Sequence, residues 1–263
     1  LLVGVVIHSS REISFYEKAL EESRAKLERQ TDELERSNEM LQGFASMASH
    51  DLKEPLRSIR AFVEILNEEY APKLDSRAQE FMKFVVEGTE RMRAMIDGLL
   101  DFSRVGRAAP GKFVPVNLNH ALDEALANLG AEMKENDCKL ERDPLPKVLG
   151  NEMLLVQVFQ NLIGNSLKYR SPETCQVKTK AKVIDGMCQI SVCDNGIGFE
   201  PEFAERVFDP FRRLDTDHTK SGSGLGLATC KAIVEQHGGK IWAETKKGAG
   251  STFHFTLPVC EAA

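Results

Sequence analysis

A seven-residue repeat of apolar positions runs through the first 50 residues and constrains the fold more than any other feature. Residues 11–50 read as one long helix in which one position of every heptad is apolar: Ile13, Leu20, Leu27, Leu34, Leu41 and Ala48. A repeat held over this length is typical of a left-handed coiled coil. The second seam is mostly polar and comprises Tyr16, Ser23, Gln30, Ser37 and Phe44. The repeat predicts a parallel dimer, whose stalk either only dimerises or transmits a signal through two near-equal packings.

Two amphipathic helical patterns follow the repeat. The first continues beyond Pro55, a residue that usually kinks a helix, and its apolar face comprises Ile59, Phe62, Val63, Ile65 and Leu66. After a break at residues 70–75, the apolar face of the second comprises Phe81, Phe84, Val85, Met92, Met95, Ile96, Leu99 and Leu100. Two helices joined by a short turn form a hairpin, and two hairpins close as a four-helix bundle. We therefore expect a homodimer through residues 41–107.

The chain changes character after a stretch with Gly and Pro at residues 106–112, which we interpret as a domain boundary. Strands are predicted at 113–118, 138–142, 175–184, 187–194, 239–245 and 251–257, and helices at about 119–135, 151–169, 201–207 and 224–237. This mixture predicts the α+β class. A coiled-coil helix leads into a helical hairpin, and a two-layer α/β sandwich follows over residues 112–260.

Charge and cysteine content narrow the choice of partners and compartment. The 263 residues carry a formal net charge of −6, and the basic residues form no stripe, so we expect no nucleic-acid partner. The six cysteines lack C-x-x-C or metal-ligand spacing, which favours reduced thiols in a cytoplasmic protein. Because the chain starts with Leu1, we expect a fragment without its upstream sensor domain. Residues 1–40 then comprise a strand remnant, or the tail of a membrane anchor, followed by the coiled-coil signalling helix.

A histidine beside a carboxylate is the first candidate for chemistry. An exposed histidine on a helix is, taken alone, usually a surface residue, and a helical aspartate is usually a solvated charge. His50 and Asp51 are adjacent, however. A neutral imidazole is nucleophilic at one nitrogen when the other donates its proton to a carboxylate. The pair therefore predicts a histidine that attacks an electrophile.

Two amides and a lysine share one helical face in NLIGNSLKY (161–169). Asn161 and Asn165 are four residues apart, and Lys168 lies about one turn beyond. Amide oxygens suit Mg²⁺, and a lysine supplies a positive charge for phosphate oxygens. Asparagines in a helix are often only tertiary hydrogen-bonding groups, but this alignment before glycine-rich loops favours a nucleotide site.

Two glycine-containing segments follow. In DNGIGF (194–199), Asp194 can accept a hydrogen bond from an adenine amino group, while Gly196 and Gly198 allow close backbone approach. GSGLGL (222–227) places glycines at the opening of a helix, where free N–H groups suit a phosphate. These glycines are Gly222, Gly224 and Gly226. Each segment taken alone is also compatible with an ordinary turn.

The segment between the two glycine blocks contains FDPFRRL (208–214). Phe208 and Phe211 are interpreted either as exposed anchors for a movable element or as ordinary core residues. Residues 209–222 are charged and bounded by glycine, which predicts a lid over the nucleotide.

Together these blocks resemble the sensor histidine kinases of two-component signalling, over residues 41–258. SHDLKEPL resembles the H-box, NLIGNSLKY the N-box, DNGIGF the first glycine box, FDPFRRL the F-box and GSGLGL the second glycine box. The segment HDLKEPLRSI is similar in sequence to the corresponding segment of phytochrome-like kinases. The resemblance implies a Bergerat-type ATP-binding sandwich behind a dimerising hairpin.

The resemblance also implies roles for individual residues. His50 would be phosphorylated, Asn165 would ligate Mg²⁺, and Asp194 would recognise adenine. The remaining ATP-binding residues would include Asn161, Lys168, Tyr169, Phe208, Phe211 and Arg213. Many relatives have Thr or Asn four residues after the histidine, where it orients a hydrolytic water, whereas this chain has Glu54. That difference leaves kinase activity untouched and puts phosphatase activity in doubt.

The function expected from these observations is ATP-dependent autophosphorylation of His50, followed by transfer to an aspartate of a response regulator receiver domain. Two alternatives remain open. The nucleotide blocks also occur in gyrase-like and chaperone ATPases, so the chain could be a scaffold that binds ATP and signals by shape alone. It could also act chiefly as a phosphatase of its partner.

Overall fold

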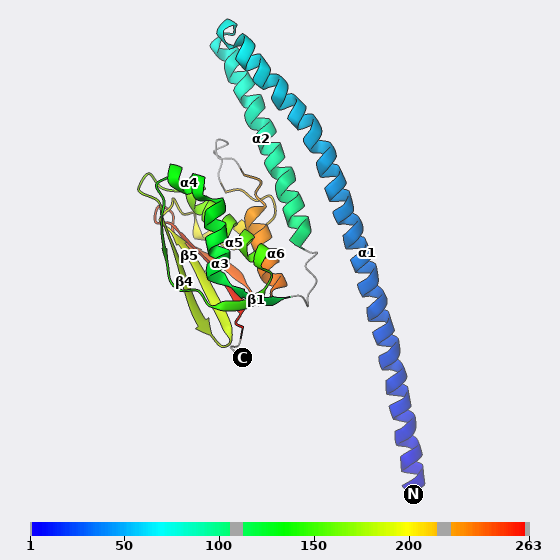
Figure 1. Ribbon diagram of the computed structural model, residues 1–263. Helices are drawn as coiled ribbons and strands as arrows, with labels where there is room; N and C mark the ends of the chain where they lie inside the picture. Colours follow the sequence, from blue (N-terminus) through cyan, green and yellow to red (C-terminus); the bar gives the residue numbers. More distant parts are fainter. Residues whose placement is uncertain (1, 106–112, 215–221, 261–263) are drawn as a thin grey trace. The chain divides into compact units, whose positions relative to one another are not determined.

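A long helix begins the chain in the computed structural model, which describes residues 2–105, 113–214 and 222–260. Helix α1 (Leu2–Tyr70) passes through Pro55 without a break (Figure 1). The strand predicted near the N-terminus is therefore wrong for the described residues. A short apolar run does not by itself distinguish a strand from a helix, and α1 continues through it. By contacts the chain divides into two compact units, Leu1–Ala48 and Ser49–Ala263.

The second helix of the hairpin is α2 (Ser76–Val105), which follows the short 3₁₀ turn η1 (Ala71–Lys73). Asp75 starts α2 by accepting a hydrogen bond from the backbone N–H of Ala78 at 2.7 Å. Two ion pairs join the arms: Lys53 with Asp97 at 2.5 Å and Arg60 with Glu90 at 3.7 Å. Within the described residues, every helix is too short or too polar to span a bilayer.

Both arms of the hairpin expose large apolar side chains. On α1 these are Leu52, Ile59, Phe62, Ile65 and Leu66, and on α2 they are Phe81, Phe84, Val85, Met92, Met95 and Leu99. They include most of the apolar face that the sequence pattern predicts. Soluble chains rarely leave so many large apolar groups in contact with water unless a partner covers them.

The boundary predicted at residues 106–112 lies outside the described residues, and a mixed sheet follows it. Its strands are β2 (Lys139–Arg142), β4 (Gln176–Ile184), β5 (Met187–Asp194), β6 (Ile241–Thr245) and β7 (Ser251–Pro258). Their order is β2-β4-β5-β7-β6, and all neighbours are antiparallel except β2 and β4. The antiparallel pairs agree with the alternating sequence patterns, but the parallel pairing of β2 with β4 at the edge of the sheet is not predicted by them.

Helices cover one face of the sheet, which gives the two layers of the domain (Figure 1). They are α3 (Leu118–Asn128), α5 (Glu152–Lys168) and α6 (Gly226–Gln236). The fully buried Phe159 of α5 packs edge-on against Phe255 of β7, with 5.8 Å between the ring centroids. The fold is thus of the α+β class, with a helical region followed by an α/β sandwich.

Smaller elements complete the domain. The helix predicted at 119–135 is divided at Leu129 into α3 and the short α4 (Gly130–Glu135). Strand β1 (Val114–Asn117) pairs with β3 (Lys147–Gly150), a strand that the sequence patterns miss. The 3₁₀ turns η2 (Pro201–Phe203) and η3 (Arg206–Phe208) replace the short helix predicted there.

Local sequence signals account for several boundaries. Asn151 caps α5, because its side chain accepts a hydrogen bond from the backbone N–H of Leu154 at 3.3 Å. Asp185 and Gly186 form the turn between β4 and β5 with φ values of 49° and 75°. Positive φ at both positions is what a two-residue hairpin turn requires, and Asp-Gly adopts it readily.

The prediction of six reduced cysteines is wrong for two of them. Cys138 and Cys175 form a disulfide, although 37 residues separate them. Sequence spacing gives no sign of this pairing, because β2 and β4 bring the two residues together only in the folded sheet. Among the described residues, Cys188, Cys193 and Cys230 carry free thiols.

Candidate active site

A cavity of about 550 Å³ lies in the α/β domain, within the size range of small-molecule sites. Ten of the residues predicted to bind ATP line it: Asn161, Asn165, Lys168, Tyr169, Asp194, Gly198, Arg213, Gly222, Gly224 and Gly226. Three others, Gly196, Phe208 and Phe211, are not among its lining residues. The fold thus gathers predicted site residues from Asn161 to Gly226 around one pocket.

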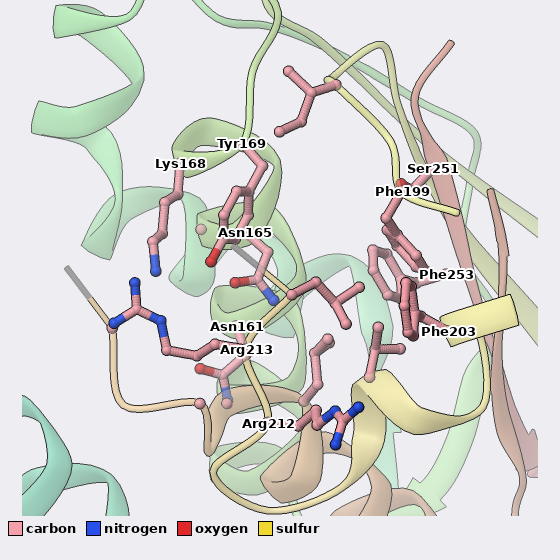
Figure 2. A pocket seen from close by; sticks show the side chains of 18 of the residues that line it. Asn161, Asn165, Lys168, Tyr169, Phe199, Phe203, Arg212, Arg213, Ser251 and Phe253 are labelled. Carbon is pink, nitrogen blue, oxygen red and sulfur yellow. The ribbon is translucent and has the colours of Figure 1, made fainter. Parts of the chain in front are cut away.

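Helix α5 supplies one wall of the cavity. Its opposite face is buried in the core through residues such as Phe159 and Leu162, so the polar residues of the helix are left facing the pocket. Figure 2 shows Asn161, Asn165 and Lys168 along this wall. The helical spacing alone therefore predicts their common orientation.

Positive charge gathers at one end of the cavity. The side chains of Lys168 and Arg213 point toward the same part of the pocket, although they come from different segments (Figure 2). The Lys168 ammonium also lies over the Tyr169 ring, 4.8 Å from its centroid. Two cations at one end of a cavity suit the oxygens of a polyphosphate.

The second glycine segment, residues 222–227, packs closely against helix α5. A Cβ on Gly222 would collide with Nζ of Lys168, and a Cβ on Gly226 would lie 3.2 Å from the Asn161 amide oxygen. Gly224 has a φ of 71°, a conformation that other residues rarely adopt. Among the residues that the structure describes, no side chain caps the N-terminus of α6, so its backbone N–H groups remain available to an anion.

Asp194, at the end of β5, also lines the cavity. Its Oδ1 accepts hydrogen bonds from the backbone N–H of Gly196 at 2.8 Å and of Ser251 at 3.2 Å. Burial raises the pKa of Asp194, and these two N–H groups and the Ser166 hydroxyl partly oppose that rise. Gly196 thus orients the carboxylate rather than lining the pocket. Oδ2 is the oxygen left to accept a hydrogen bond from a ligand.

An apolar wall, which the sequence motifs miss, lies opposite α5. Phe199, Phe203 and Phe253 group together there, with Ser251 beside them (Figure 2). A flat apolar surface beside a buried carboxylate suits a purine ring. The alternation in β7 could have indicated Ser251 and Phe253, because it places them on one face of the strand.

The aromatic pair of FDPFRRL is divided by the structure. Phe208 is only 5% exposed and packs edge-on against Phe253 at 6.3 Å between centroids, so it is a core residue. Phe211 is 58% exposed and has a φ of 60°. Of the two interpretations left open for this pair, core packing holds for Phe208, which the apolar face of β7 buries, and exposure holds for Phe211. The lid predicted at 209–222 lies partly outside the described residues, at 215–221.

His50 is accessible on α1. Its side chain is 81% exposed, and Nδ1 lies 3.4 Å from Oδ1 of Asp51. With the proton on Nδ1, shared with this carboxylate, Nε2 carries the lone pair. Glu54 is exposed one turn further along the same helix. The arrangement is that of an imidazole that can act as a nucleophile.

The donor set of the cavity fits Mg²⁺ bound together with a nucleotide. Within the described residues, no group of three or more His, Cys, Asp or Glu side chains is arranged to hold a metal. Mg²⁺ commonly takes one or two protein oxygens and completes its shell with phosphates and water. The Asn165 amide, on the same wall as Lys168, can supply such an oxygen.

Fold and cavity define an ATPase-like α/β domain that follows a helical hairpin with an exposed histidine. Comparison with protein families agrees with this description. Residues 40–108 match the His Kinase A (phospho-acceptor) domain, and residues 150–261 match the family of histidine kinase-, DNA gyrase B- and HSP90-like ATPases. The chain belongs to the sensor histidine kinases.

Individual relatives support the same assignment. Cyanobacterial phytochrome A of Nostoc sp. is 44% identical over 227 residues, which cover 86% of this chain and 30% of that protein. Phytochrome-like protein Cph1 of Synechocystis sp. is 39% identical, with the same coverage. Among solved structures, full-length ShkA in complex with AMPPNP has a TM-score of 0.60 and 27% identity, over 83% of this chain and 46% of ShkA. The chain thus spans about a third of the length of these phytochromes.

Proposed function

We propose that this chain catalyses ATP-dependent phosphorylation of His50 and passes the phosphoryl group to an aspartate of a response regulator receiver domain. One observation carries the proposal: an exposed imidazole, 3.4 Å from a carboxylate, precedes a domain with a polyphosphate-sized cavity in the same chain. The relatives are sensor kinases or photoreceptors with matching domains, and ShkA was crystallised with an ATP analogue. In this assignment residues 41–107 dimerise and accept the phosphoryl group, and residues 112–260 bind ATP.

The nucleophile is Nε2 of His50. Asp51 retains the proton on Nδ1 and offsets the positive charge that develops on the ring as Nε2 bonds to the γ-phosphorus. The bond from that phosphorus to the bridging oxygen breaks, and ADP leaves. The proton on Nδ1 stays within hydrogen-bond distance of the carboxylate throughout this step.

The pocket contributes positioning and charge neutralisation, which dominate catalysis of phosphoryl transfer. Asp194 accepts a hydrogen bond from the adenine amino group, and the apolar wall of Phe199 and Phe253 packs against the ring. Lys168 and Arg213 neutralise the phosphate oxygens. The Asn165 amide would hold Mg²⁺, which when bound would supply positive charge against the phosphate oxygens.

The chemistry of the phosphorylated product tests the proposal. Incubation with γ-labelled ATP is expected to attach label that is lost in acid and retained in alkali, as a phosphoramidate requires. Addition of an aspartate-bearing receiver domain should then move the label to that domain. Label that survives acid would indicate a phosphoester on Ser or Thr and would refute the histidine mechanism.

The same labelling experiment separates the proposed kinase activity from the two alternatives. A scaffold that signals through shape alone would bind ATP and stay unlabelled. A chain that acts chiefly as a phosphatase would remove a phosphoryl group from the receiver domain faster than it supplies one. Glu54 is exposed near His50, and the proposal assigns it no step in kinase activity.

The exposed apolar face of the hairpin leads to a prediction about assembly. We expect Phe62→Glu to raise the dissociation constant of a dimer at least about tenfold, because a buried, unpaired carboxylate opposes association. Phe62 is 68% exposed in the single chain. Sedimentation equilibrium of the two proteins measures this change. Symmetry doubles the effect, since each dimer carries the substitution twice.

The matched control for this experiment is Lys83→Glu. The Lys83 side chain is 77% exposed on α2 and is not part of the apolar face, so a glutamate there should leave assembly unchanged although it alters the charge of the chain more than Phe62→Glu does. Equal dissociation constants for both variants would contradict dimerisation through the apolar face, as would a wild-type chain that stays monomeric.

A further inference from the structure

The Cys138–Cys175 disulfide lies where two neighbouring strands begin. Cys138 directly precedes β2 and Cys175 directly precedes β4, and their Cα atoms are 4.4 Å apart. The Lys139 N–H donates to the Cys175 carbonyl at 2.9 Å, so the backbone already holds the two segments together. Cys138 is partly exposed, whereas Cys175 is only 2% exposed. Cys138 is therefore the member of the pair nearer to solvent.

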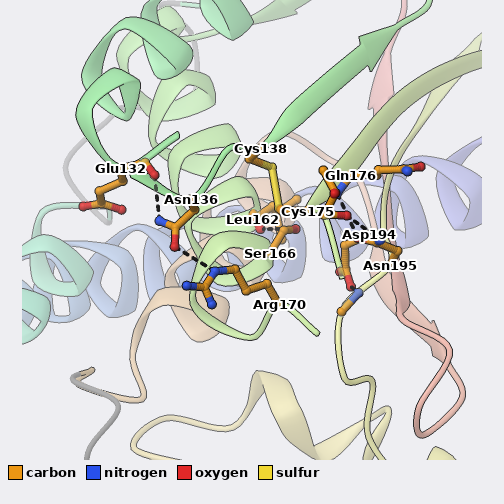
Figure 3. The surroundings of a disulfide bond; sticks show 12 residues. Glu132, Asn136, Cys138, Leu162, Ser166, Arg170, Cys175, Gln176, Asp194 and Asn195 are labelled. Atoms are coloured by element: carbon orange, nitrogen blue, oxygen red, sulfur yellow. Dashed lines mark hydrogen bonds between the residues drawn. A yellow bond between two sulfur atoms is a disulfide. The ribbon is translucent and has the colours of Figure 1, made fainter. Parts of the chain in front are cut away.

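The residues on either side of Cys175 connect it to the nucleotide cavity. The Gln176 N–H donates to Oδ1 of Asn195 at 2.8 Å, and the Asn195 amide donates to the Thr174 carbonyl at 2.9 Å (Figure 3). Asn195 directly follows Asp194, whose carboxylate lines the cavity. A displacement of Cys175 is therefore transmitted to Asp194 through the side chain of Asn195.

A second connection runs through the loop between α5 and β4. The Tyr169 carbonyl accepts a hydrogen bond from the Ile197 N–H at 2.9 Å, and both residues line the cavity. Arg170 donates to the Asn136 side chain at 2.7 Å, two residues before Cys138 (Figure 3). The loop is thus held on one side by the α4–β2 turn and on the other by the turn after β5. The disulfide adds a covalent link between the α4–β2 turn, at Cys138, and the end of this loop, at Cys175.

We propose that Cys138 and Cys175 form a reversible thiol–disulfide site that controls the affinity of the neighbouring cavity for ATP, with the oxidised form binding more tightly. The bond fixes the ends of the loop that borders Tyr169 and Asp194. Its reduction leaves Cys175 restrained only by the backbone pairing of β2 with β4, so Thr174 and Gln176 move more and binding must then order this loop at an entropic cost. The inference rests on nucleotide binding, which belongs to the proposed function.

The oxidant is a small-molecule disulfide of the glutathione class. The Cys138 thiolate attacks one of its sulfurs, forms a mixed disulfide and releases one thiol. The Cys175 thiolate then attacks the Cys138 sulfur and releases the second thiol. The protein pair loses two electrons and two protons, and the oxidant becomes two thiols. Excess dithiol reverses both steps.

The other cysteines are less suited to this exchange. Cys188 and Cys230 are fully buried, and burial raises the pKa of their thiols to about 11 and about 12, respectively. A thiol with so high a pKa holds almost no thiolate at neutral pH, and the thiolate is the reactive form. Cys193 is partly exposed but has no disulfide partner in the described part of the chain.

The test compares the whole chain after oxidised glutathione and after dithiothreitol. Alkylation with iodoacetamide followed by mass spectrometry counts the free thiols, and titration with a fluorescent ATP analogue and Mg²⁺ gives the dissociation constant. We expect two fewer alkylated cysteines in the oxidised protein and a dissociation constant about fivefold lower, at the low end of coupling between protein sites. Cys138→Ser should bind with the affinity of the reduced form under both conditions.

Cys193→Ser is the matched control, because it removes a partly exposed thiol outside the pair and should keep the wild-type response. Thermal melting of each variant verifies that it is folded. Full alkylation after oxidation, or affinities within twofold in both redox forms, would overturn the proposal. If the disulfide forms but neither the oxidised nor the reduced protein binds nucleotide, the nucleotide binding assumed in the proposed function is refuted. The redox control of that binding is then refuted as well.

Discussion

His50→Gln is expected to abolish phosphorylation of the chain, with a loss of at least about a thousandfold, because it removes the only atom assigned as nucleophile. Nucleotide binding should stay unchanged, since His50 is not among the residues that line the cavity. Glutamine is polar and favourable in a helix, so α1 should form as before. Label incorporated from γ-labelled ATP and the dissociation constant of an ATP analogue measure the two parts of this expectation.

Asp51→Asn provides a graded comparison. Its amide keeps the size of the side chain but removes the negative charge 3.4 Å from Nδ1. We expect label to accumulate about a hundredfold more slowly without disappearing, the scale usual for loss of a positioned acid–base group. Label on His50→Gln at the wild-type rate would place the phosphoryl group elsewhere and contradict the mechanism. Equal rates for Asp51→Asn and the wild type would remove the aspartate from it.

Local signals in the sequence predict most of the helices and strands. The cap at Asn151 and the Asp185-Gly186 turn each act within four residues, so both can be read from the chain. The apolar stretch at residues 2–7 fits a strand or a helix equally well, and only continuity with α1 decides between them. The four-residue strand β3 is missed because its pairing partner, β1, lies more than 30 residues away.

In the candidate site, too, some residues follow from local sequence and others are placed only by long-range contacts. Asn161, Asn165 and Lys168 follow from helical spacing, because one face of α5 must be buried. The apolar wall depends on which strand covers which turn, and no short motif carries that information. Phe208 illustrates the difference, since its own segment leaves exposure and burial open, and the contact with β7 shows that it is buried. The cysteine pair likewise depends on the parallel pairing of β2 and β4.

Asp194→Asn is expected to weaken ATP binding by about 10- to 100-fold, because a hydrogen bond to a charged acceptor contributes about 1.5–3 kcal/mol. The Gly196 and Ser251 N–H groups can still donate to the amide oxygen, so the turn after β5 should keep its shape. The preference for ATP over GTP should narrow as well, since guanine presents a carbonyl where adenine presents its amino group. Competition titrations with both nucleotides measure these changes.

Glu200→Gln is the control for this substitution. Glu200 also lines the cavity, but its carboxylate is paired with Lys247 at 2.9 Å, so its neutralisation should leave the choice of base unchanged. Equal ATP affinity of Asp194→Asn and the wild type would show that Asp194 does not contact the base.

The pH dependence of binding examines the same carboxylate without mutation. Burial raises the pKa of Asp194, so it takes up a proton at a higher pH than an exposed aspartate does. The protonated acid accepts a hydrogen bond from adenine less well than the carboxylate. ATP affinity should therefore be highest above this raised pKa and fall as the pH is lowered through it. Asp194→Asn cannot titrate, and its affinity should lack this step, whereas Glu200→Gln should retain it. An identical pH profile for wild type and Asp194→Asn would mean that another group causes the decline and that the buried carboxylate is not the adenine acceptor.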